Sequence, residues 1–120
     1  MILVDTSVWV DHFRKRNDDL AVLLSDGNVL SHPFIIGEIA CGNLKHRNDV
    51  ITYLSALPRT SSAATDEVLI LIENKKLMGK GIGWIDAHLL CSSLISNARI
   101  WTRDKNLAEV AESLKVLFKN

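Results

Sequence analysis

The sequence predicts an α/β fold with a mainly parallel sheet and helices on both faces of that sheet. Three observations support this prediction: short apolar runs without alternation, longer segments with helical spacing between them, and capping residues at the boundaries. Short strands that alternate with helices form β-α units, and such units build parallel sheets covered by helices on both sides. Strands buried on both faces are continuously apolar, as these runs are.

The first predicted strand covers residues 1–4, where four apolar residues follow one another. Asp5 ends this run, and Thr6 or Ser7 provides a hydroxyl that caps the next helix, which we expect to continue to about Phe13. A strand that leads directly into a helix is the beginning of a β-α unit. The first residues therefore set the pattern for the rest of the fold.

The remaining elements follow from apolar spacing and from residues that begin or end helices. Pro33 suits the first turn of one helix, Pro58 ends another, and Asp66 and Glu67 give a third an acidic first turn. The expected helices cover residues 18–25, 33 to about 42, about 47–56, 65 to at least 72, 84–95 and 105–113. The further expected strands are short and cover residues 29–31, 99–102 and 116–118.

Length and composition describe one globular unit. The chain has 120 residues and 13.4 kDa, and we expect residues 1–120 to form a single domain. Lys and Arg number 14, as do Asp and Glu, which excludes a generally basic nucleic-acid binder but not a local basic patch. We expect neither a membrane span nor a signal peptide. Two distant cysteines, Cys41 and Cys91, favour half-buried reduced thiols in a cytoplasmic protein.

Two acidic residues follow predicted strands at the edge where parallel sheets bind ligands, the carboxyl ends of the strands. Asp5 closes the first strand, and Asp104 comes just after the strand at 99–102. Each also has a purely structural interpretation, Asp5 as a turn residue and Asp104 as the N-cap of the last helix. Their shared position makes both candidates for a functional site.

Two further acids stand among apolar residues on predicted helices. Glu38 lies in a helix so apolar that we expect most of its surface to be buried, and an ionised carboxylate is costly there unless it is paired or binds a metal. A solvent-facing edge of that helix is the alternative. Asp86 lies in the first turn of the helix at 84–95, where the helix dipole favours a negative charge. Its apolar flanks predict partial burial, and helix capping is its alternative role.

Four carboxylates at one sheet edge would repel one another, which raises the pKa of one or more of them unless a cation binds. Carboxylate oxygens are the ligands of Mg²⁺, which keeps several waters and is often found beside phosphate oxygens. Such an ion polarises a phosphodiester and lowers the pKa of an attacking water. A parallel sheet is able to bring these residues together, although their spacing in the sequence does not prove that it does.

Four segments carry these acids in order: ILVDTSVWVDHF, IIGEIACG, WIDAHLL and IWTRDKNL. Together they resemble the four acidic motifs of the PIN-domain ribonucleases, in particular the VapC-type toxins of bacterial toxin–antitoxin pairs. The resemblance covers essentially the whole chain. It implies a three-layer α/β/α sandwich with a parallel sheet of about five strands. It also implies Mg²⁺- or Mn²⁺-dependent cleavage of RNA, a homodimer, and a cognate VapB-type antitoxin whose tail blocks the site.

Carried over position by position, the resemblance assigns both catalysis and metal binding to an acidic quartet. The quartet consists of Asp5, Glu38, Asp86 and Asp104. Asp5 and Asp86 are the expected direct metal ligands, and the other two act through water or on a second metal. Asn106 stands where some relatives carry a further acid, which leaves the number of metal ions open.

Several residues near the quartet have supporting roles, each with a structural alternative. Thr6 and Thr102 match family hydroxyls that orient a carboxylate or a metal-bound water, and a cap or turn role is their alternative. Arg103 and Lys105 flank the fourth acid and are candidates for phosphate contacts, with a solvated loop as the alternative. The three tryptophans are expected in the core or at a dimer interface rather than stacked on bases.

Two other functions stay open from the residues alone. A phosphoacceptor receiver module has a similar α/β architecture but needs paired acids after its first strand, and here Asp5 is followed by Thr6. A catalytically inactive, nuclease-like domain that only binds a partner is the second alternative. Such a role needs no clustered acids, so the complete quartet favours the ribonuclease.

Overall fold

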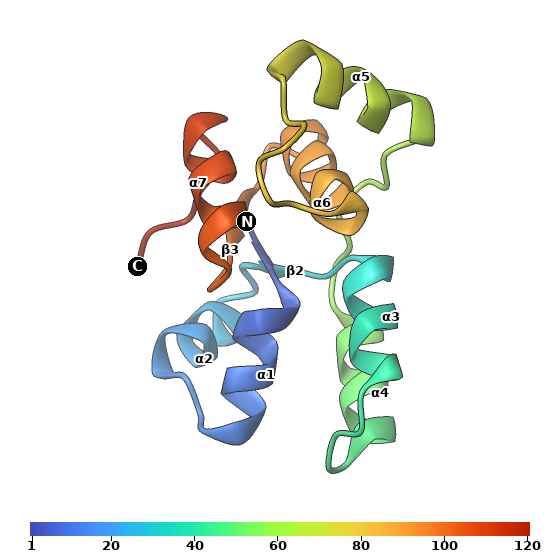
Figure 1. Ribbon diagram of the computed structural model, residues 1–120. Coiled ribbons are helices and arrows are strands. Elements are labelled where there is room, and N and C mark those ends of the chain that lie inside the picture. The colour runs from blue at the N-terminus through green and yellow to red at the C-terminus, as the bar shows by residue number, and fades with distance from the viewer.

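The computed structural model describes residues 1–120 and contains three strands surrounded by seven helices (Figure 1). Strand β1 (Ile2–Val4) lies in the centre of the sheet, between β2 (Val29–Leu30) and β3 (Arg99–Trp101). Both neighbours run parallel to β1, with Leu3 paired to Leu30 on one side and to Ile100 on the other. The predicted parallel sheet is therefore confirmed.

The expectation of about five strands is wrong, because the two outer segments pair through one residue each. Ser31 forms a parallel bridge with Arg59, and Ile100 forms one with Leu117. The predicted strand at 116–118 is thus reduced to a single bridge, held by hydrogen bonds of Ile100 to Val116 and Phe118. On the other side, the bridge at Arg59 directly follows Pro58, whose missing N–H prevents a longer ladder.

The helices begin and end close to the predicted boundaries because local capping residues define them. Asn17 accepts a hydrogen bond from the backbone N–H of Leu20, His32 accepts one from Phe34, and Asp104 accepts one from Leu107. The helices are α1 (Thr6–Arg14), α2 (Asp18–Ser25), α3 (Pro33–Cys41), α4 (Arg47–Ala56), α5 (Thr65–Lys75), α6 (Trp84–Ile95) and α7 (Lys105–Ser113).

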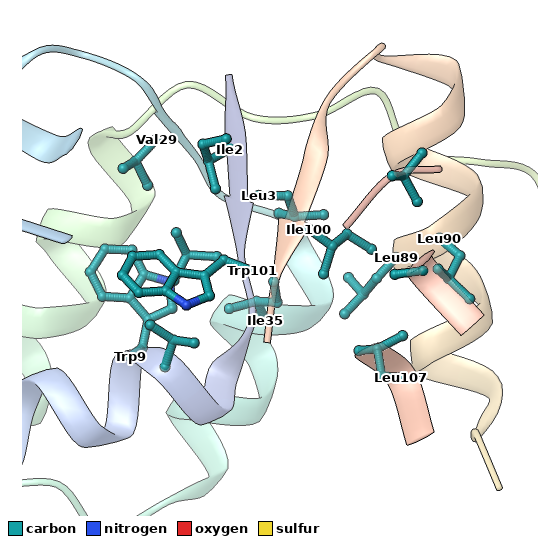
Figure 2. Packing of buried hydrophobic residues seen from close by; sticks show 14 of the residues in the cluster. Ile2, Leu3, Trp9, Val29, Ile35, Leu89, Leu90, Ile100, Trp101 and Leu107 are labelled. Atoms are coloured by element: carbon teal, nitrogen blue, oxygen red, sulfur yellow. The ribbon is translucent and has the colours of Figure 1, made fainter. Parts of the chain in front are cut away.

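The sheet is covered on both faces, as predicted for a three-layer arrangement. Figure 2 shows Trp9 of α1 and Trp101 of β3 on one side of the strands, and Leu89 of α6 and Leu107 of α7 on the other. All four side chains are buried. Burial of large apolar side chains on both faces of the sheet is the main source of stability for this fold.

No helix combines the length and the apolar character needed to cross a membrane.

The two cysteines differ in their burial. Cys41 is exposed at the end of α3, whereas Cys91 is buried in α6, so the expectation of two half-buried thiols is wrong for both residues. The reason is that Cys41 lies on the outward-facing side of α3 while Cys91 packs with Val68 of α5 and Ala87 of α6.

Candidate active site

The four predicted acids lie at the edge of the sheet formed by the carboxyl ends of the strands. Asp5 directly follows β1, and Asp104 comes three residues after β3. Glu38 lies on α3, which follows β2, and Asp86 lies in the first turn of α6, which leads back toward β3. The residues come from four separate segments of the chain, and the parallel topology brings these segments to one edge.

Asp5 is the most buried member of the quartet, with 7% of its surface exposed. Although it occupies the N-cap position of α1, its side chain makes no capping hydrogen bond. Instead, Oδ2 accepts hydrogen bonds from Thr102 Oγ1 (2.7 Å) and Ser7 Oγ (2.9 Å), whereas Oδ1 has no such partner. The interpretation of Asp5 as a mere turn residue does not explain this pair of hydroxyl donors.

Glu38 is exposed, so the expectation that α3 buries most of its surface is wrong. Ile35 and Ile39 face the core, and the opposite side of α3 faces solvent at the edge of the site. Oε1 of Glu38 accepts a hydrogen bond from Thr6 Oγ1 (2.8 Å). Partial burial raises the pKa of Glu38, the hydrogen bond from Thr6 reduces this increase, and the negative charge of Asp5 adds to it.

Asp86 is half-buried, as its apolar flanks predicted. Its Oδ2 lies 3.3 Å from the backbone nitrogen of Gly83, a long capping contact at the start of α6. Partial burial raises the pKa of Asp86, the Gly83 N–H reduces this increase, and the charges of Asp5 and Asp104 add to it. Capping thus accounts for one oxygen of this side chain and does not remove its electrostatic coupling to the other acids.

Asp104 has a structural role in addition to its place in the quartet. Its Oδ1 accepts a hydrogen bond from the Leu107 N–H (3.0 Å) and caps α7, as the alternative interpretation proposed. Its own N–H donates to Thr102 Oγ1 (3.0 Å). Thr102 therefore connects the backbone of Asp104 with the carboxylate of Asp5.

The charges of the quartet act on one another, as expected for carboxylates that share a sheet edge. Asp5 raises the pKa of both Glu38 and Asp86, Asp86 also acts on Glu38, and Asp104 acts on Asp86. Burial is the largest cause of the raised pKa of both groups, and the like charges make a smaller contribution. A cluster of this kind is stabilised by protonation or by a cation.

The chemistry of the donor set fits a hard divalent cation. All four side chains offer carboxylate oxygens, which suit Mg²⁺ and Mn²⁺. No three His, Cys, Asp or Glu side chains converge closely enough to form a ready-made metal cluster. An ion at this edge would therefore take one or two carboxylates directly and reach the others through water, a mode of binding that Mg²⁺ tolerates.

Ser7 is also part of the site, although the sequence indicated only a helix-capping role for it. Besides donating to Asp5, its Oγ accepts a hydrogen bond from the Arg103 N–H (3.0 Å) and lies 3.4 Å from Thr102 Oγ1. It therefore connects the ends of β1 and β3. The available signal was a hydroxyl two residues after Asp5, in the segment that carries the first acid.

The two basic candidates beside Asp104 are both exposed but differ in their partners. Arg103 Nε lies 2.7 Å from Asp11 Oδ2 on α1, so this guanidinium is already in an ion pair. Lys105, the first residue of α7, makes no ion pair. Asn106 donates from Nδ2 to the carbonyl oxygen of Gly81 (3.3 Å) and thereby contacts the loop that leads to Asp86.

Comparisons with known proteins agree with this geometry. The family model of the PIN domain matches residues 2–113. The chain belongs to the PIN domain family. Within the family, this PIN domain is 46% identical over 115 residues to Ribonuclease VapC32 of two Mycobacterium tuberculosis strains, a match that covers 94% of this chain and 93% of the relative.

Two solved structures share the fold of this PIN domain. VapBC-1 from nontypeable Haemophilus influenzae matches with a TM-score of 0.71 and 18% identity, over 100% of this chain and 98% of that chain. PAE2754 from Pyrobaculum aerophilum matches with a TM-score of 0.61 and 15% identity, over 94% and 85%. At these identities the two structures support the PIN-like α/β fold and nothing further.

Proposed function

We propose that this PIN domain, formed by residues 1–120, is a Mg²⁺- or Mn²⁺-dependent endoribonuclease and the toxin of a VapBC-type toxin–antitoxin pair. The observation that carries the proposal is the placement of four mutually coupled acids at one sheet edge, with a raised pKa at Glu38 and Asp86. The 46% identity to a protein named Ribonuclease VapC32 supports RNA as the substrate.

In the proposed mechanism, Asp5 and Asp86 would hold the cation directly, and Glu38 and Asp104 would act through water or on a second cation. When bound, Mg²⁺ or Mn²⁺ polarises a phosphodiester and lowers the pKa of water. Ser7 and Thr102 fix Oδ2 of Asp5 and leave Oδ1 available as a ligand.

Glu38 is the proposed general base. Thr6 fixes its Oε1, so the other oxygen, Oε2, is available to accept a proton from the attacking water. A carboxylate with a raised pKa is a better proton acceptor near neutral pH than an unperturbed one. The water oxygen then attacks phosphorus, and the bond from phosphorus to the leaving ribose oxygen breaks. The leaving oxygen takes up a proton from solvent, and Glu38 returns its proton to solvent.

The proposed partners and compartment rest on one structural relative and on exposed side chains of this chain. The similarity in fold to a VapBC structure supports a VapB-type antitoxin as the cognate partner. Exposed apolar side chains on the packed helices α5 and α6, such as Leu69, Ile70 and Ile95, support a homodimer that covers part of this surface. The exposed free thiol of Cys41 supports a reducing compartment, the cytoplasm.

The proposal is tested with Asp5→Asn and Asp86→Asn, which retain the shape of each side chain and remove its charge. Both variants should cleave RNA at least about 100-fold more slowly than the parent and should no longer arrest growth. Asp26→Asn is the matched control, because Asp26 is exposed in the turn that leads to the opposite edge of the sheet. Circular dichroism confirms that each variant is folded.

Metal binding is tested separately by thermal melting in Mg²⁺, Mn²⁺ and EDTA. An ion that binds only the folded state stabilises it by about 2.7 kcal/mol at 100 times its Kd. Parent-like cleavage by the folded aspartate variants would exclude the quartet as the active site. An unchanged melting temperature at millimolar metal would count against the divalent cation.

A further inference from the structure

Two exposed aromatic rings lie near the acidic quartet, and one of them belongs to a tryptophan that we expected in the core or at a dimer interface. Phe34, at the start of α3, is 38% exposed, and Trp84, the first residue of α6, is 42% exposed. The other two tryptophans, Trp9 and Trp101, are buried in the core, as expected. Trp84 is thus the one tryptophan of the chain that solvent reaches freely.

Phe34 and Trp84 line a common groove between α3 and the first turn of α6. The groove has a volume of about 370 Å³, within the range of small-molecule sites. Glu38 also lines it, so the groove reaches one member of the quartet. Gly37 has open space where a side chain would stand, which leaves room beside the rings.

One buried side chain contacts both rings and holds them in place. His88 of α6 makes T-shaped contacts with both, at centroid distances of 4.8 Å to Phe34 and 4.6 Å to Trp84. His88 itself is buried. Rings fixed in this way lose little conformational freedom when a ligand binds, so they form a preorganised stacking surface.

We propose that Phe34 and Trp84 bind an unpaired nucleobase of the RNA substrate next to the phosphodiester that is cleaved. This inference rests on the proposed ribonuclease function. Proteins read single-stranded RNA by stacking splayed bases on aromatic side chains. The lining contains no basic residue and is almost entirely apolar, so it suits the flat face of a base and not a phosphate. Because Glu38 lines the groove, a base bound there lies next to the quartet, where the adjoining phosphodiester is cleaved.

Binding is tested through the fluorescence emission of Trp84. The protein in EDTA is titrated with a single-stranded RNA oligonucleotide, and tryptophan emission is recorded. We expect base-dependent quenching that is lost in Trp84→Phe, and weaker quenching by an oligonucleotide with abasic positions. Equal quenching in the parent and in Trp84→Phe, or none in the parent, overturns the inference. Emission that changes with protein concentration alone also overturns it, because a second copy of the chain would then cover the ring.

The activity test separates base binding from chemistry. In Mn²⁺, Phe34→Leu and Trp84→Leu should raise KM about 5- to 150-fold, the usual effect of losing one stacked base, while kcat is retained. Tyr53→Leu is the matched control, because Tyr53 is an exposed aromatic residue on α4 that does not line this groove. An unchanged KM in both leucine variants overturns the inference. If the parent cleaves no RNA but Trp84 is still quenched, the proposed function fails and the base site stands.

Discussion

Acidification should destabilise this protein through His32, a buried histidine at the start of α3. Its side chain is 1% exposed, its Nδ1 accepts a hydrogen bond from the Phe34 N–H (3.0 Å), and its Nε2 lies 3.1 Å from Ser92 Oγ. Burial, and to a lesser degree the charge of His88, lowers the pKa of His32 from 6.5 to about 4. The folded protein therefore holds this ring in its neutral form near neutral pH.

The sign and the size of the effect follow from proton linkage. Because the pKa of His32 is lower in the folded state, the unfolded chain binds more protons between pH 6.5 and about 4. The free energy of unfolding therefore falls as the pH is lowered through this window. The full difference in pKa corresponds to about 3 kcal/mol, of which about 2 kcal/mol is lost between pH 7 and pH 5.

The assay compares urea unfolding at pH 7 and pH 5 for the parent and for His32→Asn. Asparagine offers an acceptor for the Phe34 N–H and does not titrate, so the variant lacks the proton-linked loss. We expect the parent to lose about 2 kcal/mol more than His32→Asn. His46→Asn is the control: His46 is exposed with a φ of 56°, a conformation that asparagine tolerates, and this variant should behave like the parent.

The comparison between variants is needed because other groups act in the opposite direction. Glu38 and Asp86 have a raised pKa in the folded state, so their protonation stabilises the fold as the pH falls. The curve of the parent alone is the sum of both effects. Equal losses in the parent and in His32→Asn would refute the reasoning, because they would show that the buried ring is not held neutral.

Three further changes give measurable outcomes. Thr102→Val removes the donor to the Asp5 carboxylate and should lower the free energy of unfolding in urea by about 2 kcal/mol, whereas a loss below about 0.5 kcal/mol would contradict the contact. Gly81→Ala places a Cβ 2.4 Å from Asn106 Nδ2 and should lower the melting temperature more than Gly27→Ala, which has a similar positive φ but open space. Addition of EDTA to the protein in millimolar Mg²⁺ should lower the melting temperature, and no change would argue against a resident cation.

The helices were predictable from the sequence because local residues determine where they begin and end. Pro33 and Asp104 act within one turn of their own helices, and the structure places both as expected. The outer strands were not predictable to the same degree. Arg59 lies in no apolar run, and its pairing with Ser31 depends on contacts between distant segments. The sequence pattern therefore identifies the sheet type but not the number of paired residues at its edges.

In the candidate site, too, features set by neighbouring residues were predictable, and features that depend on residues far apart in the chain were not. The four acids were identifiable one by one from their positions at strand ends and helix starts. The exposed side of α3 was not identifiable from the sequence, because an apolar composition does not tell which side of a helix faces the core. Ile35 is buried whereas Phe34 next to it is exposed. The role of Ser7 depends on Thr102, 95 residues away, and becomes visible only when β1 and β3 are adjacent.

The hydroxyl groups explain how the fold tolerates four acids at one edge. Each of the two acids with a hydroxyl partner is held by a residue from another segment: Thr6 of α1 donates to Glu38 of α3, and Thr102 after β3 donates to Asp5 after β1. A hydrogen bond to an ionised carboxylate contributes about 1.5–3 kcal/mol, which offsets part of the repulsion. Because these bonds use Oε1 and Oδ2, the second oxygen of each carboxylate stays available. The same contacts that stabilise the charged cluster therefore leave one oxygen of each of these two carboxylates free for the cation that we propose.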